Sequence, residues 1–513
     1  MRHLALISGA DPTRQLDALF INAPLRDYGL RPRTNDYTLP VLGMAYIATY
    51  AQNAGFNVGV LDAEAHGLGI KETAEIVNGL TPRWAAMNLL APTYAMSARI
   101  AENLAPDIAL MVGGHHAKAM PDRILNDPRM KNLRALVLGE GELRVAALLE
   151  DEQRRRELPG VIWRDPILGT RATGIADAKT SALMLGPDIN TLPYVNRAFL
   201  PQDPYQAAPT ATDQRIAQAR GRDWLAAAAR DGHMEANIVG SRGCPYNCTF
   251  CGAAWSANQD VKIRVRSPQD IIGELDQLHD EYGVTCFRFV DDLFLGVRDV
   301  IHEHMKAFAA SRIGDRYVWD ATGRINVLDR LSNRDLDVLV HNGLREVALG
   351  IESGSDAILK AMDKRINADM TERIARRLLS RGIGVKGYFI LGFPGETRAD
   401  LDATVRHIRN LWDIADHSTG DIRASVFEFR PYPGTPVWTT LTDAGHDPDK
   451  LLAYGDVDLT GDGADESMRQ RDEFNFSVGI QFGEVPLEDI RSTLGMLTRE
   501  QYERNQPTTE AAA

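Results

Sequence analysis

Short apolar runs alternate with amphipathic segments along the first 150 residues of the chain. Five runs have the length and composition of buried strands, and the segments between them, such as 39–55 and 70–80, carry apolar residues at helical spacing. This alternation predicts a parallel sheet covered by helices, and ligands bind such sheets beyond the carboxyl ends of the strands. The predicted strands are ALFINAP (18–24), VGVLDAE (58–64), AAMNLLAPTY (85–94), IALMVGGHHA (108–117) and ALVLGEGE (135–142).

The same alternation resumes near residue 236 with a second set of apolar runs. Amphipathic segments such as DIIGELDQLHDEYG and DMTERIARRLLSRG separate these runs. Six strands joined by crossover helices predict an incomplete (β/α)6 barrel. The runs are NIVGSRGC (237–244), TCFRFVDD (285–292), YVWDATGR (317–324), REVALGIES (345–353), VKGYFILGFPG (385–395) and RASVFEFRPYPG (423–434).

A chain of 513 residues is too long for one compact core, which indicates several domains. We expect an α/β protein with an N-terminal Rossmann-like domain, a partial barrel and a small C-terminal region that covers the barrel mouth. The stretch between the two sets of strands is rich in Pro, Ala and Gln, and its sequence is compatible with a linker or with a lid. The predicted boundaries are 1–160, 161–235, 236–435 and 436–513.

The formal net charge of −13 argues against a long nucleic-acid groove, which needs a basic surface. No run reaches the roughly 18 uninterrupted apolar residues of a membrane span, and the first residues lack the pattern of a signal peptide. We therefore expect a cytoplasmic protein with neither nucleic acid nor membrane as a partner.

Three of the four cysteines gather in the segment SRGCPYNCTFCGAAW, with the spacing C-x3-C-x2-C. A reducing cytoplasm disfavours disulfides. A structural zinc site needs four protein ligands, so the nearest upstream histidine, His233, keeps a Cys3His zinc knuckle as an alternative. A [4Fe-4S] cluster held by three thiolates leaves one iron open to another ligand. We expect such a cluster on Cys244, Cys248 and Cys251, where it would also be the catalytic centre.

The motif C-x3-C-x-aromatic-C resembles the signature of radical S-adenosylmethionine (SAM) enzymes. The resemblance implies that the open iron binds SAM and that an electron from the cluster cleaves it to a 5′-deoxyadenosyl radical. FRFVDDLF, WDATGRIN, REVALGIESGSD and GYFILGFPGET follow in the family's order, so the resemblance covers most of 236–435. Helix caps, surface groups and turns are the ordinary alternatives for these residues. The implied SAM contacts are Phe250, Asp291, Asp292, Arg324, Glu352, Ser353, Gly392 and Pro394.

The region in front of the barrel resembles the cobalamin-binding domain that precedes this kind of radical SAM core. NAP, LDAEAHG, LLAPTY, MVGGHHA and LGEGE appear in the family's order over roughly 17–145. Glycine lets the backbone approach a bulky corrin closely, although ordinary strand-to-helix turns use glycine too. The implied cobalamin contacts are Thr93, Gly113, Gly114, His115, Gly139, Glu140 and Gly141.

A cobalt-ligating histidine is not evident in this region. Cobalamin domains of another kind carry D-x-H-x-x-G, and EAHGLG places Glu64, His66 and Gly69 at a similar spacing. However, this segment follows the second predicted strand rather than the first. We expect His66 to be a turn or surface histidine.

Together the two resemblances imply a cobalamin-dependent methyltransferase. One SAM molecule methylates cobalamin, another supplies the radical, and an unactivated carbon of a small secondary metabolite receives the methyl group, for instance in antibiotic biosynthesis. The cofactors carry the difficult chemistry, and the protein binds, orients and excludes water. An external donor (a flavodoxin, a ferredoxin or a dedicated reductase) would supply the electron.

Two other hypotheses stay open. An enzyme with the same SAM cleavage but no methyl transfer would dehydrate, epimerise or rearrange a polyol or aminosugar, and the carboxylates of Asp291, Asp292, Glu352 and Glu428 would bind an aminoglycoside cation. A non-catalytic iron–sulfur or zinc protein would only bind a partner. Candidate walls of the substrate site, although aromatic residues are more often core, are Tyr432, Trp438, Phe474 and Phe476.

Overall fold

The computed structural model describes residues 3–30, 38–165, 167, 169–173, 186–220, 223–259, 261, 263–456 and 476–505, so Phe474 lies outside the described residues. The chain divides into two compact units, each with its own seven-stranded sheet. The first unit comprises Met1–Asp203, Phe250–Arg264 and Tyr432–His446, and the second comprises Pro204–Thr249, Val265–Pro431 and Asp447–Ala513. The boundaries predicted at 160, 235 and 435 stay predictions.

The sheet of the first unit has the strand order β2-β1-β3-β4-β5-β6-β7. Its first five strands are parallel and coincide with the five predicted runs. They are β1 (Ala18–Asn22), β2 (Val58–Asp62), β3 (Trp84–Asn88), β4 (Ala109–Gly113) and β5 (Leu133–Val137). The helices of this unit are α1 (Leu42–Asn53), α2 (Ile70–Leu80), α3 (Tyr94–Glu102), α4 (His115–Ala119), α5 (Pro121–Asn126), α6 (Glu142–Glu150) and α18 (Pro436–Asp443).

Two antiparallel strands extend this sheet where the sequence suggested only a linker or lid. They are β6 (Val161–Asp165) and β7 (Gly169–Thr173), and β6 pairs with β5 through Leu136 and Val137. The sequence leaves 161–173 open between a linker and a lid, and it predicts no strand there. A five-residue strand with charged residues at its exposed end gives little periodic signal.

The sheet of the second unit has the order β16-β15-β14-β13-β12-β9-β8. Six of its strands are parallel, as predicted for a partial barrel, and β8 (Tyr205–Gln206) adds an antiparallel edge. The six are β9 (Met234–Ile238), β12 (Cys286–Phe289), β13 (Val318–Gly323), β14 (Leu344–Glu352), β15 (Gly384–Leu391) and β16 (Ile422–Glu428). Four two-residue strands lie outside both large sheets: β10 (Ser241–Arg242), β11 (Arg264–Val265), β17 (Gly455–Asp456) and β18 (Phe476–Ser477).

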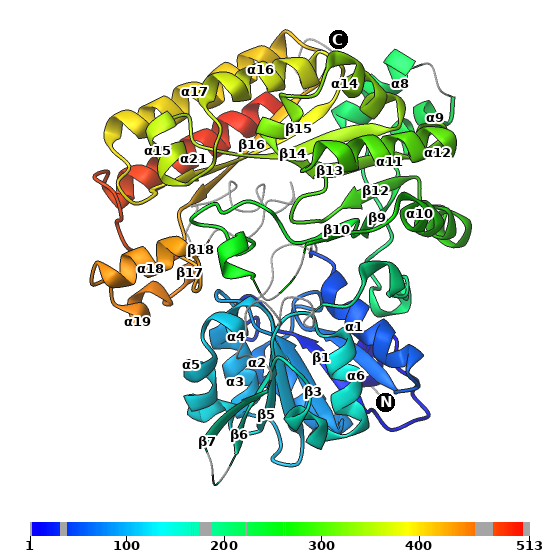
Figure 1. The fold of residues 1–513 in the computed structure, drawn as a ribbon, viewed down its shortest axis with the longest axis vertical. Helices are drawn as coiled ribbons and strands as arrows, with labels where there is room; N and C mark the ends of the chain where they lie inside the picture. The colour runs from blue at the N-terminus through cyan, green and yellow to red at the C-terminus, as the bar shows by residue number, and fades with distance from the viewer. Residues whose placement is uncertain are drawn as a thin grey trace. The chain divides into compact units, whose positions relative to one another are not determined.

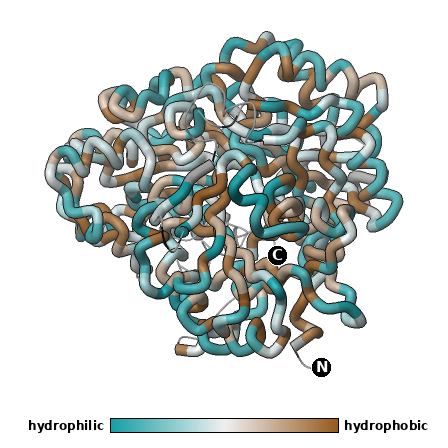
Figure 2. The backbone as a smooth tube through the Cα atoms, turned by 60° about the horizontal axis from the view of Figure 1, so that its bottom comes forward, coloured by the Kyte–Doolittle hydropathy of each residue, from teal (hydrophilic) through white to brown (hydrophobic). Residues whose placement is uncertain are grey.

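Long amphipathic helices cover the outer face of this partial barrel (Figure 1). Buried apolar residues of these helices form one core cluster with those of the strands. Hydrophobic and hydrophilic stretches alternate along the backbone (Figure 2). Among the described residues, no helix has both the length and the hydrophobicity needed to cross a bilayer. The described helices of the second unit, long and short together, are α8 (Ala211–Arg220), α9 (Asp223–Asp231), α10 (Pro268–Tyr282), α11 (Arg298–Ala310), α12 (Ile313–Arg316), α13 (Ile325–Leu328), α14 (Asn333–His341), α15 (Asp356–Ala361), α16 (Ala368–Leu379), α17 (Arg398–Asp416), α19 (Pro448–Leu451) and α21 (Leu487–Asn505).

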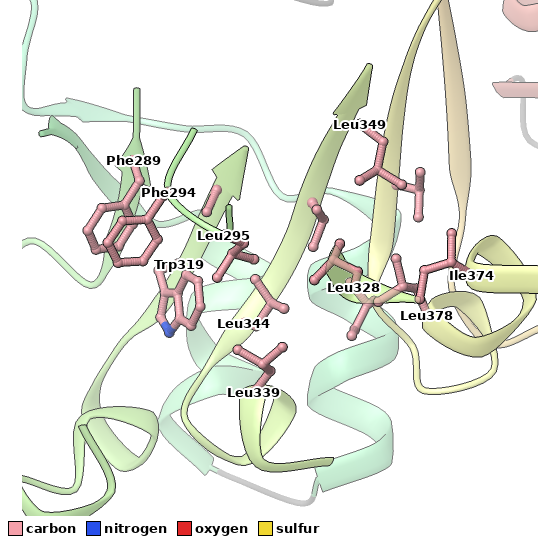
Figure 3. Close-up of a cluster of buried hydrophobic side chains, with 14 of the residues drawn as sticks. Phe289, Phe294, Leu295, Trp319, Leu328, Leu339, Leu344, Leu349, Ile374 and Leu378 are labelled. Atoms are coloured by element: carbon pink, nitrogen blue, oxygen red, sulfur yellow. The ribbon is translucent and has the colours of Figure 1, made fainter. Parts of the chain in front are cut away.

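The core between strands and helices is built around aromatic side chains. Phe289 stacks on Phe294 with their ring centroids 4.0 Å apart, and Trp319 meets Phe289 edge-on at 5.7 Å (Figure 3). The indole of Trp319 donates a hydrogen bond to the carbonyl of Asn342, so its one polar atom is satisfied in the apolar interior. This core holds the strands whose carboxyl ends carry the candidate site.

A buried ionic network fills the opposite, amino-terminal end of the barrel strands. Oxygen and sulfur atoms of Glu235, Cys286 and Asp320 lie within 4.8 Å of one another, as metal ligands do. Arg345, however, donates to Asp320 and also binds Asp213 at 3.0 Å. Because a guanidinium already supplies the positive charge, we interpret this cluster as an ion-pair network. Cys286 belongs to it and lies apart from the cysteine motif.

Candidate cluster and cofactor sites

The cysteine motif lies in the loop after β9. It begins just past the short strand β10. Cys248 is buried, and Cys244 and Cys251 are partly buried. The loop is fastened to the end of α15, because the backbone N–H of Thr249 donates to Met362 O at 3.0 Å and its hydroxyl donates to Ala361 O at 3.3 Å. The division between the two units falls between Thr249 and Phe250, so each part of the motif is described within its own unit.

A buried arginine lies against the second cysteine. Nη1 of Arg324 is 3.3 Å from Sγ of Cys248, and its guanidinium carbon lies 3.9 Å from the ring centroid of Tyr246. The other terminal nitrogen donates to the carbonyl of Lys364. Arg324 is only 6% exposed and forms no ion pair with a carboxylate among the described residues. A buried cation beside thiol ligands fits an anionic iron–sulfur cluster held by these cysteines.

The two acids predicted as SAM contacts hold the loop in front of the cysteines. One carboxylate oxygen of Asp291 accepts hydrogen bonds from the backbone N–H groups of Gly240 and Ser241, at 2.8 and 2.9 Å. Asp292 accepts one from Gly243, the residue before Cys244. Burial raises the pKa of Asp291 to about 7, although its two backbone hydrogen bonds oppose that rise. The contact of Asp291 and Asp292 with SAM stays a prediction. Their hydrogen bonds give both a role in positioning the loop before Cys244.

Glu352 and Ser353 end β14 at an irregular, left-handed turn. Glu352 has φ 67° and pairs with the ammonium of Lys364 at 2.6 Å, with both side chains buried. Positive φ recurs at Asp363 and Arg365, on either side of that lysine. The hydroxyl of Ser353 bonds Thr404 on α17 at 2.9 Å, inside the core. Backbone strain of this kind gathers at functional sites, and here it places the Lys364 carbonyl beside Arg324.

The GFPGET turn after β15 encloses a buried carboxyl group. Gly392 (φ 81°) and Gly395 (φ 83°) adopt left-handed conformations on either side of the half-buried Pro394. The N–H of Gly392 donates to Glu396 at 2.6 Å, and burial raises the pKa of Glu396 to about 7. Sequence analysis named Gly392 and Pro394 but missed Glu396, whose side chain shapes the turn.

In the first unit, the predicted cobalamin residues lie at the carboxyl ends of β3, β4 and β5. Thr93 precedes α3, and Gly114 (φ 93°) leads into α4, where a side chain would collide with Asn88. His115 is exposed. His116, beside it, is 2% exposed and packs on Tyr94 with 4.7 Å between ring centroids. Neither His116 nitrogen has a hydrogen-bond partner among the described residues, and burial lowers its pKa to about 4.

Gly139, Glu140 and Gly141 form the turn between β5 and α6. Gly139 has φ 68°, which favours glycine, and a Cβ at Gly141 would meet the end of the Ile47 side chain at 2.6 Å, so that side chain would have to shift. The Glu140 carboxylate accepts from Arg264 at 2.9 Å, and Arg264 also donates to Pro187 O at 2.7 Å. The cobalamin contact of Glu140 stays a prediction, because the structure gives its carboxylate a cationic partner. His66 lies in an exposed turn after β2.

A turn of glycines and an unpartnered buried imidazole at the carboxyl edge of a parallel sheet fit a large, partly polar ligand such as cobalamin. Residues that sequence analysis missed include Tyr246, Lys364 and Arg264. Tyr246 lies inside the motif CPYNC, which offered a signal, whereas Lys364 in a loop and Arg264 in the short strand β11 lie in segments without a motif.

Comparisons with known proteins agree with both halves of this picture. The radical SAM superfamily model matches residues 238–408, and the B12 binding domain model matches residues 33–149. An uncharacterized methyltransferase of Pyrococcus horikoshii is 27% identical over 78% of this chain and 78% of its own length. The cytidylyl-2-hydroxyethylphosphonate methyltransferase of Streptomyces wedmorensis is 26% identical over 80% of this chain and 79% of its own.

Among solved structures, the radical SAM methyltransferase TsrM of Kitasatospora setae has the same fold. With a TM-score of 0.58 and 17% identity, the match covers 84% of this chain and 76% of TsrM, in a structure with tryptophan substrate and a SAM analogue bound. A second TsrM structure contains cobalamin and a [4Fe-4S] cluster. The matches to the B12 binding and radical SAM models, in this order along one chain, identify it as a cobalamin-dependent radical SAM enzyme, whose cofactors are a [4Fe-4S] cluster, SAM and cobalamin.

Proposed function

We propose that this chain is a methyltransferase that uses a deoxyadenosyl radical to methylate an unactivated carbon of a small secondary metabolite. The observation that carries the proposal is the succession, within one chain, of a B12 binding domain and a radical SAM domain. Bound cobalamin supplies the methyl group in such chemistry, and cleaved SAM supplies the radical. Cys244, Cys248 and Cys251 hold the cluster, and an external flavodoxin, ferredoxin or reductase provides the electron.

The side chains around the motif then have separate tasks. Asp291 and Asp292 fix the loop that leads into the cysteines, through the N–H groups of residues 240, 241 and 243. The ion pair of Glu352 with Lys364 keeps the strained end of β14 in place. SAM contacts are proposed for Phe250, Asp291, Asp292, Arg324, Glu352, Ser353, Gly392 and Pro394, and cobalamin contacts for Thr93, Gly113, Gly114, His115, Gly139, Glu140 and Gly141.

The proposal of a small-molecule substrate agrees with the names of the relatives. One of them is named for a cytidylyl phosphonate and another holds tryptophan, and both of these are small molecules that the relatives methylate or bind. Transfer to carbon, and to a secondary metabolite, is the part of the proposal that goes beyond these names.

The aminosugar alternative loses support in the geometry. Glu352 is neutralised by Lys364, and Glu428 is bound by Arg491 at 3.0 Å. Asp291 is buried with its oxygen turned to backbone N–H groups. Of the four carboxylates considered for binding a polycation, only Asp292 is exposed.

The test needs no knowledge of the substrate. Protein purified without oxygen is reconstituted with iron, sulfide and hydroxocobalamin, and the visible spectrum of the desalted protein reports bound cobalamin. SAM with a deuterated methyl group is then added under a reductant, and the methyl label in extracted cobalamin is measured by mass spectrometry. Labelled methylcobalamin supports the proposal. Protein that binds cobalamin and cleaves SAM without labelling it would instead be a radical enzyme without methyl transfer.

A further inference from the structure

Arg324 carries a buried positive charge that no carboxylate of the described chain neutralises. Its side chain is 6% exposed, and its Nε has no hydrogen-bond partner in the part of the chain that the structure describes. Two other buried cations of the barrel have acidic partners, because Arg345 pairs with Asp320 and Lys364 pairs with Glu352. A buried charge without a partner is costly, so Arg324 is adapted to an anion that the polypeptide alone does not supply.

The nearest group able to become that anion is Cys248. Nη1 of Arg324 lies 3.3 Å from Sγ of Cys248, within hydrogen-bond distance for a sulfur acceptor. Three thiolates around a [4Fe-4S]2+ core leave the assembly with a net charge of −1, and one added electron makes it −2. The guanidinium therefore faces an anion whose charge grows on reduction.

Two contacts keep the guanidinium at this distance. The ring of Tyr246 lies 3.9 Å from its central carbon, and the carbonyl of Lys364 accepts from its other terminal nitrogen. Tyr246 is two residues before Cys248 in the same loop, so stacking on it joins the arginine to the loop that carries the sulfur. The lysine carbonyl is fixed in turn by the left-handed residues 363 and 365 and by the ion pair with Glu352.

We propose that Arg324 is the counter-charge of the iron–sulfur cluster and raises its reduction potential, and that Tyr246 is the positioning residue that holds Arg324 against Cys248. The proposal rests on the cluster of the proposed function but on neither cobalamin nor methyl transfer. Hydrogen bonds to cluster sulfurs and nearby charge set such potentials, and a cation stabilises the more negative, reduced form. One electron arrives from a ferredoxin- or flavodoxin-class donor, and the proposal requires no proton transfer.

The test is a redox titration of the reconstituted cluster without SAM and without cobalamin, followed by the electron paramagnetic resonance signal of the reduced form. Arg324→Gln removes the charge, and we expect the ratio of reduced to oxidised cluster at a fixed potential to fall by about tenfold, which corresponds to about 59 mV for one electron. Tyr246→Leu removes the stacking surface and should lower the ratio by roughly threefold, since the guanidinium stays present but is no longer held against Cys248 by a cation–π contact. Tyr246→Phe keeps the ring and should stay at the wild-type potential, as a positioning role requires.

Arg365→Gln is the matched control. Arg365 also lies close enough to interact electrostatically with Cys248, but its side chain is 66% exposed and paired with Asp363, so its removal should leave the potential unchanged. Iron and sulfide contents equal to wild type establish that each variant holds an intact cluster. An intact Arg324→Gln cluster at the wild-type potential would overturn the proposal. If Arg324→Gln loses its cluster, an intact Tyr246→Leu cluster at the wild-type potential overturns the proposal equally. A reduction potential of Tyr246→Phe that shifts as far as that of Tyr246→Leu refutes the role of stacking.

Discussion

Arg264 binds the carboxylate of Glu140 from 124 positions further along the chain, and both side chains are largely buried. Glu140 belongs to the turn between β5 and α6 of the first unit, and Arg264 ends the segment that follows Cys251. A second contact acts on the same segment, because Lys118 donates to Asn258 at 3.2 Å and Asn258 donates back to the carbonyls of Gly252 and Ala254. The B12 binding domain therefore holds residues 252–264 as part of its own unit.

Breaking this ion pair should loosen that segment. We expect Glu140→Gln to cost about 1–3 kcal/mol locally, since it leaves a largely buried guanidinium with one fewer acceptor. Hydrogen–deuterium exchange measures this loosening, and we expect peptides from 252–264 to exchange faster in Glu140→Gln than in the wild type. Glu500→Gln removes the partner of the more exposed Arg409 and is the control, expected to leave these peptides unchanged. Unchanged exchange in Glu140→Gln would show that the pair does not fasten the segment.

The cluster should depend on the motif cysteines and not on the fourth cysteine. Cys248→Ala should lose the four-iron content and the formation of deoxyadenosine, because two thiolates do not hold the cluster. Cys286→Ala removes a thiol that is fully buried among Glu235, Asp320 and Arg345, and it should keep the iron content of the wild type. Iron and sulfide analysis of both proteins is the measurement. Deoxyadenosine formation retained by Cys248→Ala would refute the ligand assignment.

The ion pair at the end of β14 should contribute strongly to stability. Lys364→Met removes the cation beside the buried carboxylate of Glu352, and we expect a loss of about 3–5 kcal/mol in the free energy of unfolding. The double variant Glu352→Gln/Lys364→Met should recover part of the loss, since no charge then stays buried. Asp315→Asn, at an exposed pair with Arg312, should cost under about 1 kcal/mol. Chemical denaturation compares the variants, and a double variant no better than Lys364→Met would contradict the account.

The buried carboxyl group of Glu396 should make stability depend on pH. Its pKa is about 7 in the folded protein and near 4.5 when exposed, so the unfolded chain releases this proton first as pH rises. The group's contribution to stability is thus present below about pH 4.5 and is lost progressively up to about pH 7. The loss is at most about 1.4 kcal/mol per pH unit.

Glu396→Gln keeps an acceptor for Gly392 and removes this titration. Its melting temperature should therefore fall less steeply than that of the wild type between pH 5 and pH 7. Parallel curves for the two proteins would show that Glu396 does not titrate in this range. Asp291, whose pKa is also raised to about 7, titrates in both proteins and cancels in the comparison.

Strand positions were predictable because each buried strand is an apolar run bounded by turn residues. This holds for the five parallel strands of the first sheet and for five of the six in the second, with Asp291 and Arg324 just after strand ends. The first barrel strand, predicted at 237–244, is β9 at 234–238, because the apolar run continues past the end of the strand into the loop before the cysteines. The pattern fails for β6 and β7, whose short runs at 161–173 carry charges. Such strands form because β5 leaves a sheet edge with which β6 can pair, and β7 then pairs with β6. The local sequence pattern carries no information about that edge.

The site was predictable where residues share a motif and unpredictable where they meet across the chain. Cys248 and Arg324 were named from their own segments, but their contact joins positions 76 apart. Lys364 comes from a loop after α15, and only folding brings its carbonyl to Arg324 and its ammonium to Glu352. The roles of Asp291 and Glu140 likewise depend on which backbone or cation the fold places beside them.

The proposed function requires that the cluster and cobalamin act together in methyl transfer. The most direct test compares wild type and Cys248→Ala, each with and without cobalamin, under a reductant with methyl-labelled SAM, and measures deoxyadenosine and labelled methylcobalamin in each reaction. We predict deoxyadenosine in both wild-type reactions, labelled methylcobalamin only in the wild-type reaction with cobalamin, and no deoxyadenosine from Cys248→Ala. Wild-type protein that holds cluster and cobalamin yet forms neither product would contradict the claim.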